Sequence, residues 1–297
     1  MQQINFKFEI VTPLIMAGVD KNQVELREQS IKGILRWWFR FYKGASLGLK
    51  ELKKEEGEIW GSQELASRIR VLIKKRDLVS GEAYLCMNDR RAKGENEAVR
   101  PYDKIQRKSY TSGKFEIDFG ILPQFNLDKT LNELNNTLFF LTNFGGIGAR
   151  WRRGFGSIMI KDNKNFQISG NRVEEIAEEL KKKLKQFPIN QSKQDFDFMN
   201  LSNTSIYLIP PKNNFWRSWE DAMNELRDNF YRELKRKLSV EAIAIGNPRK
   251  VSPLIIQIKK ISKGFYGVVL ICNKWDKHDE CVKQIKSLNF EIKEVKT

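Results

Sequence analysis

The feature of this sequence that most constrains its fold is an order of predicted strands and helices that occurs twice along its 297 residues. Alternating apolar and polar residues predict strands, and apolar residues three or four apart predict helices. In each half the core order is β-α-β-β-α-β. This is the order of the ferredoxin-like fold, in which both helices cover one face of an antiparallel sheet. The sequence therefore predicts an α+β protein with two tandem ferredoxin-like domains.

The predicted elements also suggest domain boundaries. In the first half we expect strands at 3–11, 68–77, 82–87, 115–121 and 155–160, and helices at 30–43, 51–60 and 128–142. In the second half we expect strands at 204–210, 253–261, 264–272 and 289–295, and helices at 215–238 and 277–288. Residues 171–187 between them are predicted as an amphipathic helix. The expected organisation is a first domain at 1–163, a helical connector at 164–203 and a second domain at 204–297.

The charge of the chain points to a polyanionic partner. Lys and Arg outnumber Asp and Glu by 53 to 37, which gives a formal charge of +16 and an isoelectric point near 9.6. Nucleic acid is the first candidate and an anionic membrane surface the second, although a lysine-rich genome would produce the same balance. No apolar run approaches the roughly 20 residues that span a bilayer. The start, MQQINFKFEIVT, lacks the apolar core of a signal peptide, so we expect a soluble, cytoplasmic protein.

The stretch FGGIGARWRRGFGS, residues 144–157, is the strongest candidate for a binding site. Glycine allows close backbone approach, and arginine grips phosphate oxygens with a fixed geometry. A dinucleotide-binding loop is excluded, because Trp151 stands where the third glycine of its motif belongs. A Walker loop is excluded, because no Gly-Lys-Ser/Thr follows the glycines. A solvated glycine-rich turn is the alternative. The predicted RNA contacts are Gly145, Gly146, Gly148, Arg150, Arg152 and Arg153.

The helix predicted at 30–43 carries a second basic surface. At about 100° per residue, Lys32, Arg36, Arg40 and Lys43 share one narrow arc on the predicted solvent side. The opposite side is apolar, and Trp37 and Phe39 are expected to rim the basic arc. Such a stripe is often only solvated. Aromatic rings beside cations are also what proteins use to bind single-stranded RNA, so we include the four basic residues among the predicted RNA contacts.

A third basic segment spans 88–114, which we expect to be a long insertion between strands with little hydrophobic periodicity. Its eight basic residues could be solvated or could hold RNA.

Five motifs make the chain resemble the RAMP superfamily of CRISPR-associated proteins, within it the first-numbered subunits of type III-B (Cmr) RNA-targeting effectors. They are TPLIMAGVD (12–20), ELREQSIKGILRWWFR (25–40), IWGS (59–62), FGGIGARWRRGFGS (144–157) and PRKVSPL (248–254). The resemblance implies two ferredoxin-like domains, a place near the 3′ end of the guide RNA, a role in target capture, and other RAMP subunits as partners. It also adds Arg249 and Lys250 to the predicted RNA contacts. Ala17 and Trp151 depart from the usual family pattern.

The sequence favours binding over catalysis. Its one histidine, His278, lies far from the glycine-rich stretch, and no second acid accompanies Asp20. We therefore expect a non-catalytic subunit that binds single-stranded RNA, guide or target, without cofactor, metal or membrane. The alternative is a metal-dependent RNA endonuclease of the same superfamily that uses Asp20. A stand-alone RNA-recognition module fits the fold but lacks the aromatic strand motif of such modules.

Overall fold

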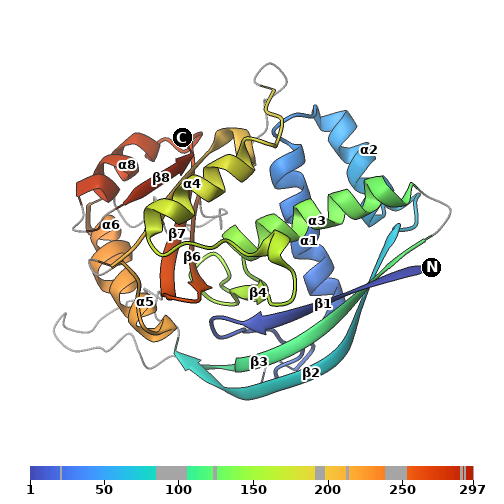
Figure 1. The fold of residues 1–297 in the computed structure, drawn as a ribbon, viewed down its shortest axis with the longest axis horizontal. Helices are drawn as coiled ribbons and strands as arrows, with labels where there is room; N and C mark the ends of the chain where they lie inside the picture. Colours follow the sequence, from blue (N-terminus) through green and yellow to red (C-terminus); the bar gives the residue numbers. More distant parts are fainter. Residues whose placement is uncertain are drawn as a thin grey trace.

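The computed structural model describes residues 1–20, 22–84, 106–122, 126–190, 198–211, 214–237, 253–287, 290 and 292–296. These residues form a mixed α/β structure with two four-stranded sheets, in the orders β2-β3-β1-β4 and β6-β7-β5-β8 (Figure 1). All strand pairs in both sheets are antiparallel. The predicted antiparallel α+β character is confirmed. No helix within these ranges is both long and apolar enough to cross a bilayer.

The first sheet packs against two long helices. It contains β1 (Gln2–Ile10), β2 (Ile69–Tyr84), β3 (Gln106–Ile121) and β4 (Ile158–Ile160), and the first unit also has helices α1 (Glu28–Lys43), α2 (Leu49–Trp60) and α3 (Leu127–Phe144). Phe8 and Phe115 stack across β1 and β3 with ring centroids 5.2 Å apart. Tyr42 of α1 stacks on Phe140 of α3 at 5.4 Å. This aromatic core holds α1 and α3 on the same side of the sheet.

The long hairpin of β2 and β3 differs from the prediction. The strands expected at 68–77 and 82–87 form one strand through Tyr84, and residues 106–114 of the expected insertion belong to β3. Both faces of this part of β2 are largely exposed. A strand without a buried face does not require alternating apolar residues. The alternation of apolar and polar residues therefore did not predict the full length of this strand. Residues 85–105 of the predicted basic segment lie outside the described residues.

The second sheet contains β5 (Thr204–Ile209), β6 (Leu254–Ile261), β7 (Gly264–Cys272) and β8 (Lys293–Lys296). The helix predicted at 215–238 begins only at Trp219, because Trp216 pairs instead with Phe265 in an isolated bridge. It then runs as α5 (Trp219–Glu225), a π-helical segment η5 (Leu226–Tyr231) and α6 (Arg232–Lys237). Helix α8 (His278–Ser287) packs beside α6.

Both faces of the second sheet are covered, and this joins the two units. One face, with Tyr207 and Val269, packs against the layer of α5, η5, α6 and α8. The other face, with Ile206 and Leu270, belongs to the same apolar cluster as the core of the first unit. Helix α4 (Val173–Leu184) lies over this second face in Figure 1 and buries its predicted apolar side. Short 3-10 turns, η2 (Lys164–Phe166) and η4 (Leu201–Asn203), form the two ends of the connector.

Candidate nucleic-acid interface

The glycine-rich loop, residues 145–157, connects α3 to β4 and is fixed at its base to the segment after β1. The Ile147 N–H donates to the Gly156 carbonyl at 2.8 Å, which closes the loop on itself. The Ala149 N–H donates to the Ile15 carbonyl at 2.6 Å, and the Gly156 N–H donates to the Pro13 carbonyl at 2.9 Å. Backbone groups bonded in this way leave only the tip of the loop at the surface, where Ala149 is exposed.

The second unit holds the other side of the loop through its edge strand β6. The Gly154 N–H donates to the Ile256 carbonyl at 2.8 Å, and the Ile256 N–H donates to the Arg152 carbonyl at 3.0 Å. The buried Gln257 amide also donates to the Trp151 carbonyl. The loop therefore extends the second sheet beyond β6 while remaining rooted in the first unit. Sequence reasoning missed Gln257, because only the pairing of the loop with β6 gives this residue a role.

The glycines allow this packing. A Cβ on Gly145 would overlap the Trp38 indole, and one on Gly146 would lie 2.9 Å from both the Phe155 and Gly156 carbonyl oxygens. Gly156 has φ of +66°, which only glycine adopts readily. Because Gly145 and Gly146 are buried, the prediction that they contact RNA does not fit their position. Gly148 is half-buried beside the tip.

The three loop arginines lie at the partly exposed tip, and two of them pack against aromatic rings. Arg152 lies between two tryptophans, with its guanidinium carbon 5.2 Å from the centre of the Trp37 ring and 5.1 Å from that of Trp151. Arg153 lies 5.6 Å from the centre of the Tyr231 ring. Burial lowers the pKa of Arg152 to about 10, so the group keeps its charge at neutral pH. Arg150 has φ of +59°, a left-handed conformation that turns the chain at the tip.

The basic stripe of α1 is only partly exposed and is paired with acids, which corrects the prediction of a solvent-facing stripe. Arg36 and Arg40 both bind the carboxylate of Glu56 on α2, at 2.7 and 3.0 Å. The Glu56 side chain is only 8% exposed, whereas the two arginines remain 36% and 38% exposed. Phe39, which we expected at the rim, is fully buried and contacts Trp60 of α2. The physical cause is that α2 packs along the side of α1 that was predicted to face solvent.

The two ends of the stripe also have distinct surroundings. Lys43 binds Glu133 at 2.7 Å and Glu55 at 3.1 Å. Burial alone would lower the pKa of Lys43, but these two carboxylates outweigh it and raise the pKa. Burial and the neighbouring Arg36 charge lower the pKa of Lys32. Three acids therefore neutralise most of the charge of the four predicted basic residues.

Two further predictions concern residues outside this surface. Asp20 accepts a hydrogen bond from the Asn22 N–H at 2.8 Å, so its carboxylate stabilises a local turn. Among the described residues, no three His, Cys, Asp or Glu side chains converge as a metal site. The predicted contacts Arg249 and Lys250 lie outside the described residues.

The chain and its fold have clear relatives among known proteins. The family model of the RAMP superfamily matches residues 7–159, more than half of the chain. The chain therefore belongs to the RAMP superfamily. Two relatives are Cmr1 subunits of the CRISPR system of Pyrococcus furiosus. Cmr1-2 is 29% identical over 188 residues, which cover 54% of this chain and 96% of that protein, and Cmr1-1 is 22% identical over 291 residues, which cover 91% and 84%.

Solved structures show the same fold. The apo crystal structure of Cmr1 from Pyrococcus furiosus matches with a TM-score of 0.65 and 19% identity, over 99% of both chains. A chain in the cryo-EM structure of the type III-B Cmr-beta bound to cognate target RNA and AMPPnP matches with a TM-score of 0.57 and 13% identity, over 95% of this chain and 98% of that one.

Proposed function

We propose that this chain is a non-catalytic, RNA-binding subunit of a type III-B Cmr effector, which helps to capture the target RNA near the 3′ end of the guide. The two β-α-β-β-α-β units are ferredoxin-like domains in this proposal. The observation that carries it is the placement of Arg150, Arg152 and Arg153 at the tip of a loop that both units clamp. Arginine forks bind phosphate oxygens in a fixed geometry, and a rigid loop spends little entropy on that binding.

The likeness to Cmr1 subunits and to a chain of an RNA-bound Cmr assembly supports this partner class. The tip adds two tryptophan rings to the three arginines, and aromatic rings beside cations suit single-stranded RNA because every base has a face that can stack. Arginine positions a backbone but does not exchange protons at neutral pH, so this site supports binding and not general acid–base cleavage.

The competing endonuclease proposal rests on Asp20, whose carboxylate is engaged in a local turn. Cleavage by this chain requires that Asp20 and a metal act together, and the described residues contain no group of three acidic, histidine or cysteine side chains that could hold such a metal. We therefore favour the binding role.

The test is the salt dependence of binding to a labelled single-stranded RNA. If each loop arginine meets one phosphate, the Arg150→Ala, Arg152→Ala, Arg153→Ala triple variant reduces the slope of log affinity against log salt by about 2, at about 0.7 per contact. The matched control replaces Lys50, Lys53 and Lys54 on the exposed side of α2 by Ala, which removes the same charge elsewhere. Equal slopes for wild type and loop variant refute the proposed contact surface.

A further inference from the structure

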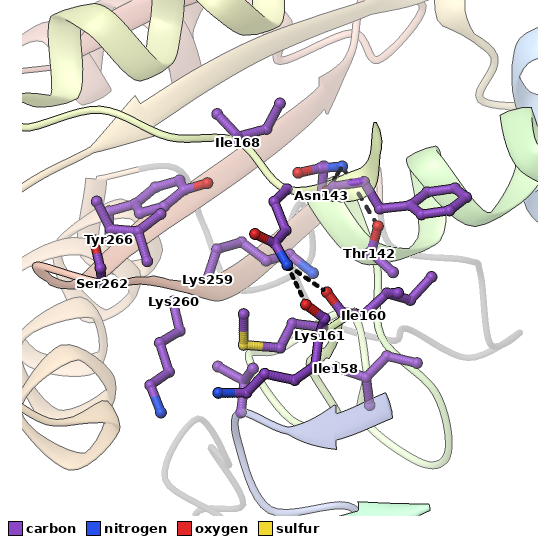
Figure 2. Close-up of a pocket in the computed structure, with 15 residues that line it drawn as sticks. Thr142, Asn143, Ile158, Ile160, Lys161, Ile168, Lys259, Lys260, Ser262 and Tyr266 are labelled. Atoms are coloured by element: carbon purple, nitrogen blue, oxygen red, sulfur yellow. Dashed lines mark hydrogen bonds between the residues drawn. The ribbon is translucent and has the colours of Figure 1, made fainter. Parts of the chain in front are cut away.

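A pocket of about 370 Å³ lies where the two units meet (Figure 2), and none of the three loop arginines lines it. Its walls come from the end of α3, from β4 and the segment that follows it, and from the β6–β7 hairpin. Apolar side chains such as Ile158, Ile160 and Ile168 form much of the lining. The volume falls in the range of small-molecule sites, and such sites combine apolar walls with a few polar groups.

The most unusual group in this pocket is the ammonium of Lys259. Its side chain is only 4% exposed and donates a hydrogen bond to the Gly145 carbonyl at the end of α3. None of the pocket-lining residues is acidic. A buried cation without a nearby anion is costly, and burial lowers the pKa of Lys259 well below its ordinary value. An anion in the pocket removes this cost.

The rim of the pocket adds further positive charge. Lys161 and Lys260 line it as well, and both bind the same carboxylate, that of Glu9, at 3.0 Å. With Lys259 in its charged form, which a bound anion favours, three lysines against one shared carboxylate give an excess of two positive charges. A phosphate monoester carries a charge of about −1.5 to −2 at neutral pH and matches this excess, whereas a carboxylate would neutralise only half of it.

The neutral polar groups suit a nucleobase. The Asn143 amide donates to the Phe139 carbonyl at 2.9 Å and to the Phe166 carbonyl at 3.3 Å, which leaves its oxygen as an acceptor. Gln167 likewise donates to the carbonyls of Ile160 and Lys161. Figure 2 shows Asn143, Lys259 and the Tyr266 hydroxyl extending from different segments toward the same space. Amide acceptors match the exocyclic amino groups of nucleobases.

We propose that this pocket binds a single nucleotide through its phosphate, either a free mononucleotide or the phosphorylated end of an RNA chain. The phosphate lies against Lys259, and the base lies between the isoleucine walls within reach of Asn143 and Gln167. The arginines of the loop tip do not line this pocket. A test of nucleotide binding in the pocket is therefore independent of a test of the RNA surface proposed above.

The test is calorimetric titration of the full chain with AMP, adenosine and inorganic phosphate. We expect AMP to bind at least tenfold more tightly than either adenosine or phosphate, because only AMP satisfies both the cation and the apolar walls. Binding of AMP no tighter than inorganic phosphate overturns the nucleotide assignment, and no measurable binding of AMP at millimolar concentration overturns the site.

Two variants and one control locate the ligand. Lys259→Met removes the buried charge at similar size, and Met159→Trp fills the pocket from β4 without touching the bond between Lys259 and Gly145. We expect each to weaken AMP binding at least tenfold, while Lys182→Met, on the exposed side of α4, leaves it unchanged. Unchanged AMP binding in the Met159→Trp variant refutes the pocket even if Lys259→Met fails to fold.

Competition experiments distinguish the two sources of the nucleotide. An oligonucleotide with a terminal phosphate that displaces AMP, when its terminal hydroxyl form does not, assigns the pocket to an RNA end. Displacement by mononucleotides alone assigns it to a free nucleotide. The triple variant of the loop arginines retains AMP binding in either case, which separates failure of this site from failure of the proposed RNA surface.

Discussion

Trp37 of α1 and Trp151 of the glycine-rich loop meet edge to face, with ring centroids 5.2 Å apart. The two residues are far apart in the sequence. Their contact joins α1 and the glycine-rich loop, which the sequence analysis identified as two separate basic segments, into one surface. Arg152 lies against both rings. The loop tip is therefore aligned with α1 by aromatic packing and with β6 by backbone hydrogen bonds.

We expect this contact to couple loop stability to RNA affinity. Trp37→Ala and Trp151→Ala each remove one ring from Arg152, so the double variant loses less stability than the sum of the two, by about 0.5–1.5 kcal/mol. Affinity for single-stranded RNA falls in both single variants. Chemical denaturation and fluorescence anisotropy measure the two effects, with Trp275→Ala in the second unit as the control. Strict additivity, with RNA affinity unchanged, contradicts the coupling.

Because Arg36 and Arg40 of α1 bind Glu56, the expected effect of replacing these two arginines on stability differs from the prediction made from the sequence. The sequence alone predicts that Arg36→Ala with Arg40→Ala leaves the fold intact. The structure predicts a loss of about 2 kcal/mol instead, because the buried Glu56 carboxylate loses both partners while the arginines themselves are partly solvated.

Adding Glu56→Gln to that double variant should recover much of the lost stability, since a neutral amide tolerates burial better than an unpaired charge. Urea unfolding of the wild type, the double variant and the triple variant measures this. A triple variant less stable than the double variant would show that Glu56 is not the group left unpaired. RNA binding by the same proteins tests the predicted contacts of Arg36 and Arg40.

The acid dependence of stability should depend in part on Glu9, which links β1 to Lys161 and to Lys260 of β6. Burial alone would raise the pKa of Glu9, but the bonds from the two lysines outweigh it and lower the pKa. A lowered pKa in the folded state contributes stability above the unfolded value of about 4.3, and this contribution is lost as the pH falls through the folded value.

Glu9→Gln should therefore reduce the free energy of unfolding by about 1 kcal/mol or less at pH 7, because both lysines are well exposed. The difference from wild type should shrink as the pH falls from about 5 to about 3. Urea unfolding at several pH values measures it, and Glu64→Gln, an exposed acid before β2, serves as the control. A difference that grows on acidification reverses the inferred sign.

Asp20→Ala provides the sharpest separation between the binding and nuclease proposals. The substitution removes one exposed turn hydrogen bond, so we expect a stability loss of about 1 kcal/mol or less. In an assembled Cmr effector, target RNA should be cut at the same positions and rates with the variant as with the wild type. Loss of one specific cut with RNA binding retained would establish the nuclease in place of the binding subunit.

Much of the fold follows from local pattern. The alternation in β1 and the continuous apolar runs of β5 to β7 predicted strands that the structure contains, and the spacing of Val173, Ile176, Leu180 and Leu184 predicted the buried side of α4. These patterns predict helices and strands because a buried face requires apolar residues at the regular spacing of a helix or a strand. The exposed part of β2 has no such face, and its full length was missed for that reason.

The sequence predicted only part of the candidate site. The arginines of the loop and the aromatic residues of α1 were visible as residue types, but their partners were not. Gly145 was predicted to approach RNA and instead gives room to Trp38, and Lys259 was not singled out at all. A glycine that permits close approach has the same sequence signature whether its neighbour is a ligand or the protein itself.

The sequence by itself determined the strand and helix order, the apolar side of α1, the excess of positive charge and the cluster of arginines after α3, because each depends on residues close together in the chain. Only the tertiary structure decided which of those charges are neutralised and which segments meet. Glu56 reaches Arg36 and Arg40 because α2 packs beside α1, and Gln257 reaches Trp151 because β6 lies against the loop. Such pairings depend on the relative orientation of distant elements, which packing of the whole core sets and no local period encodes.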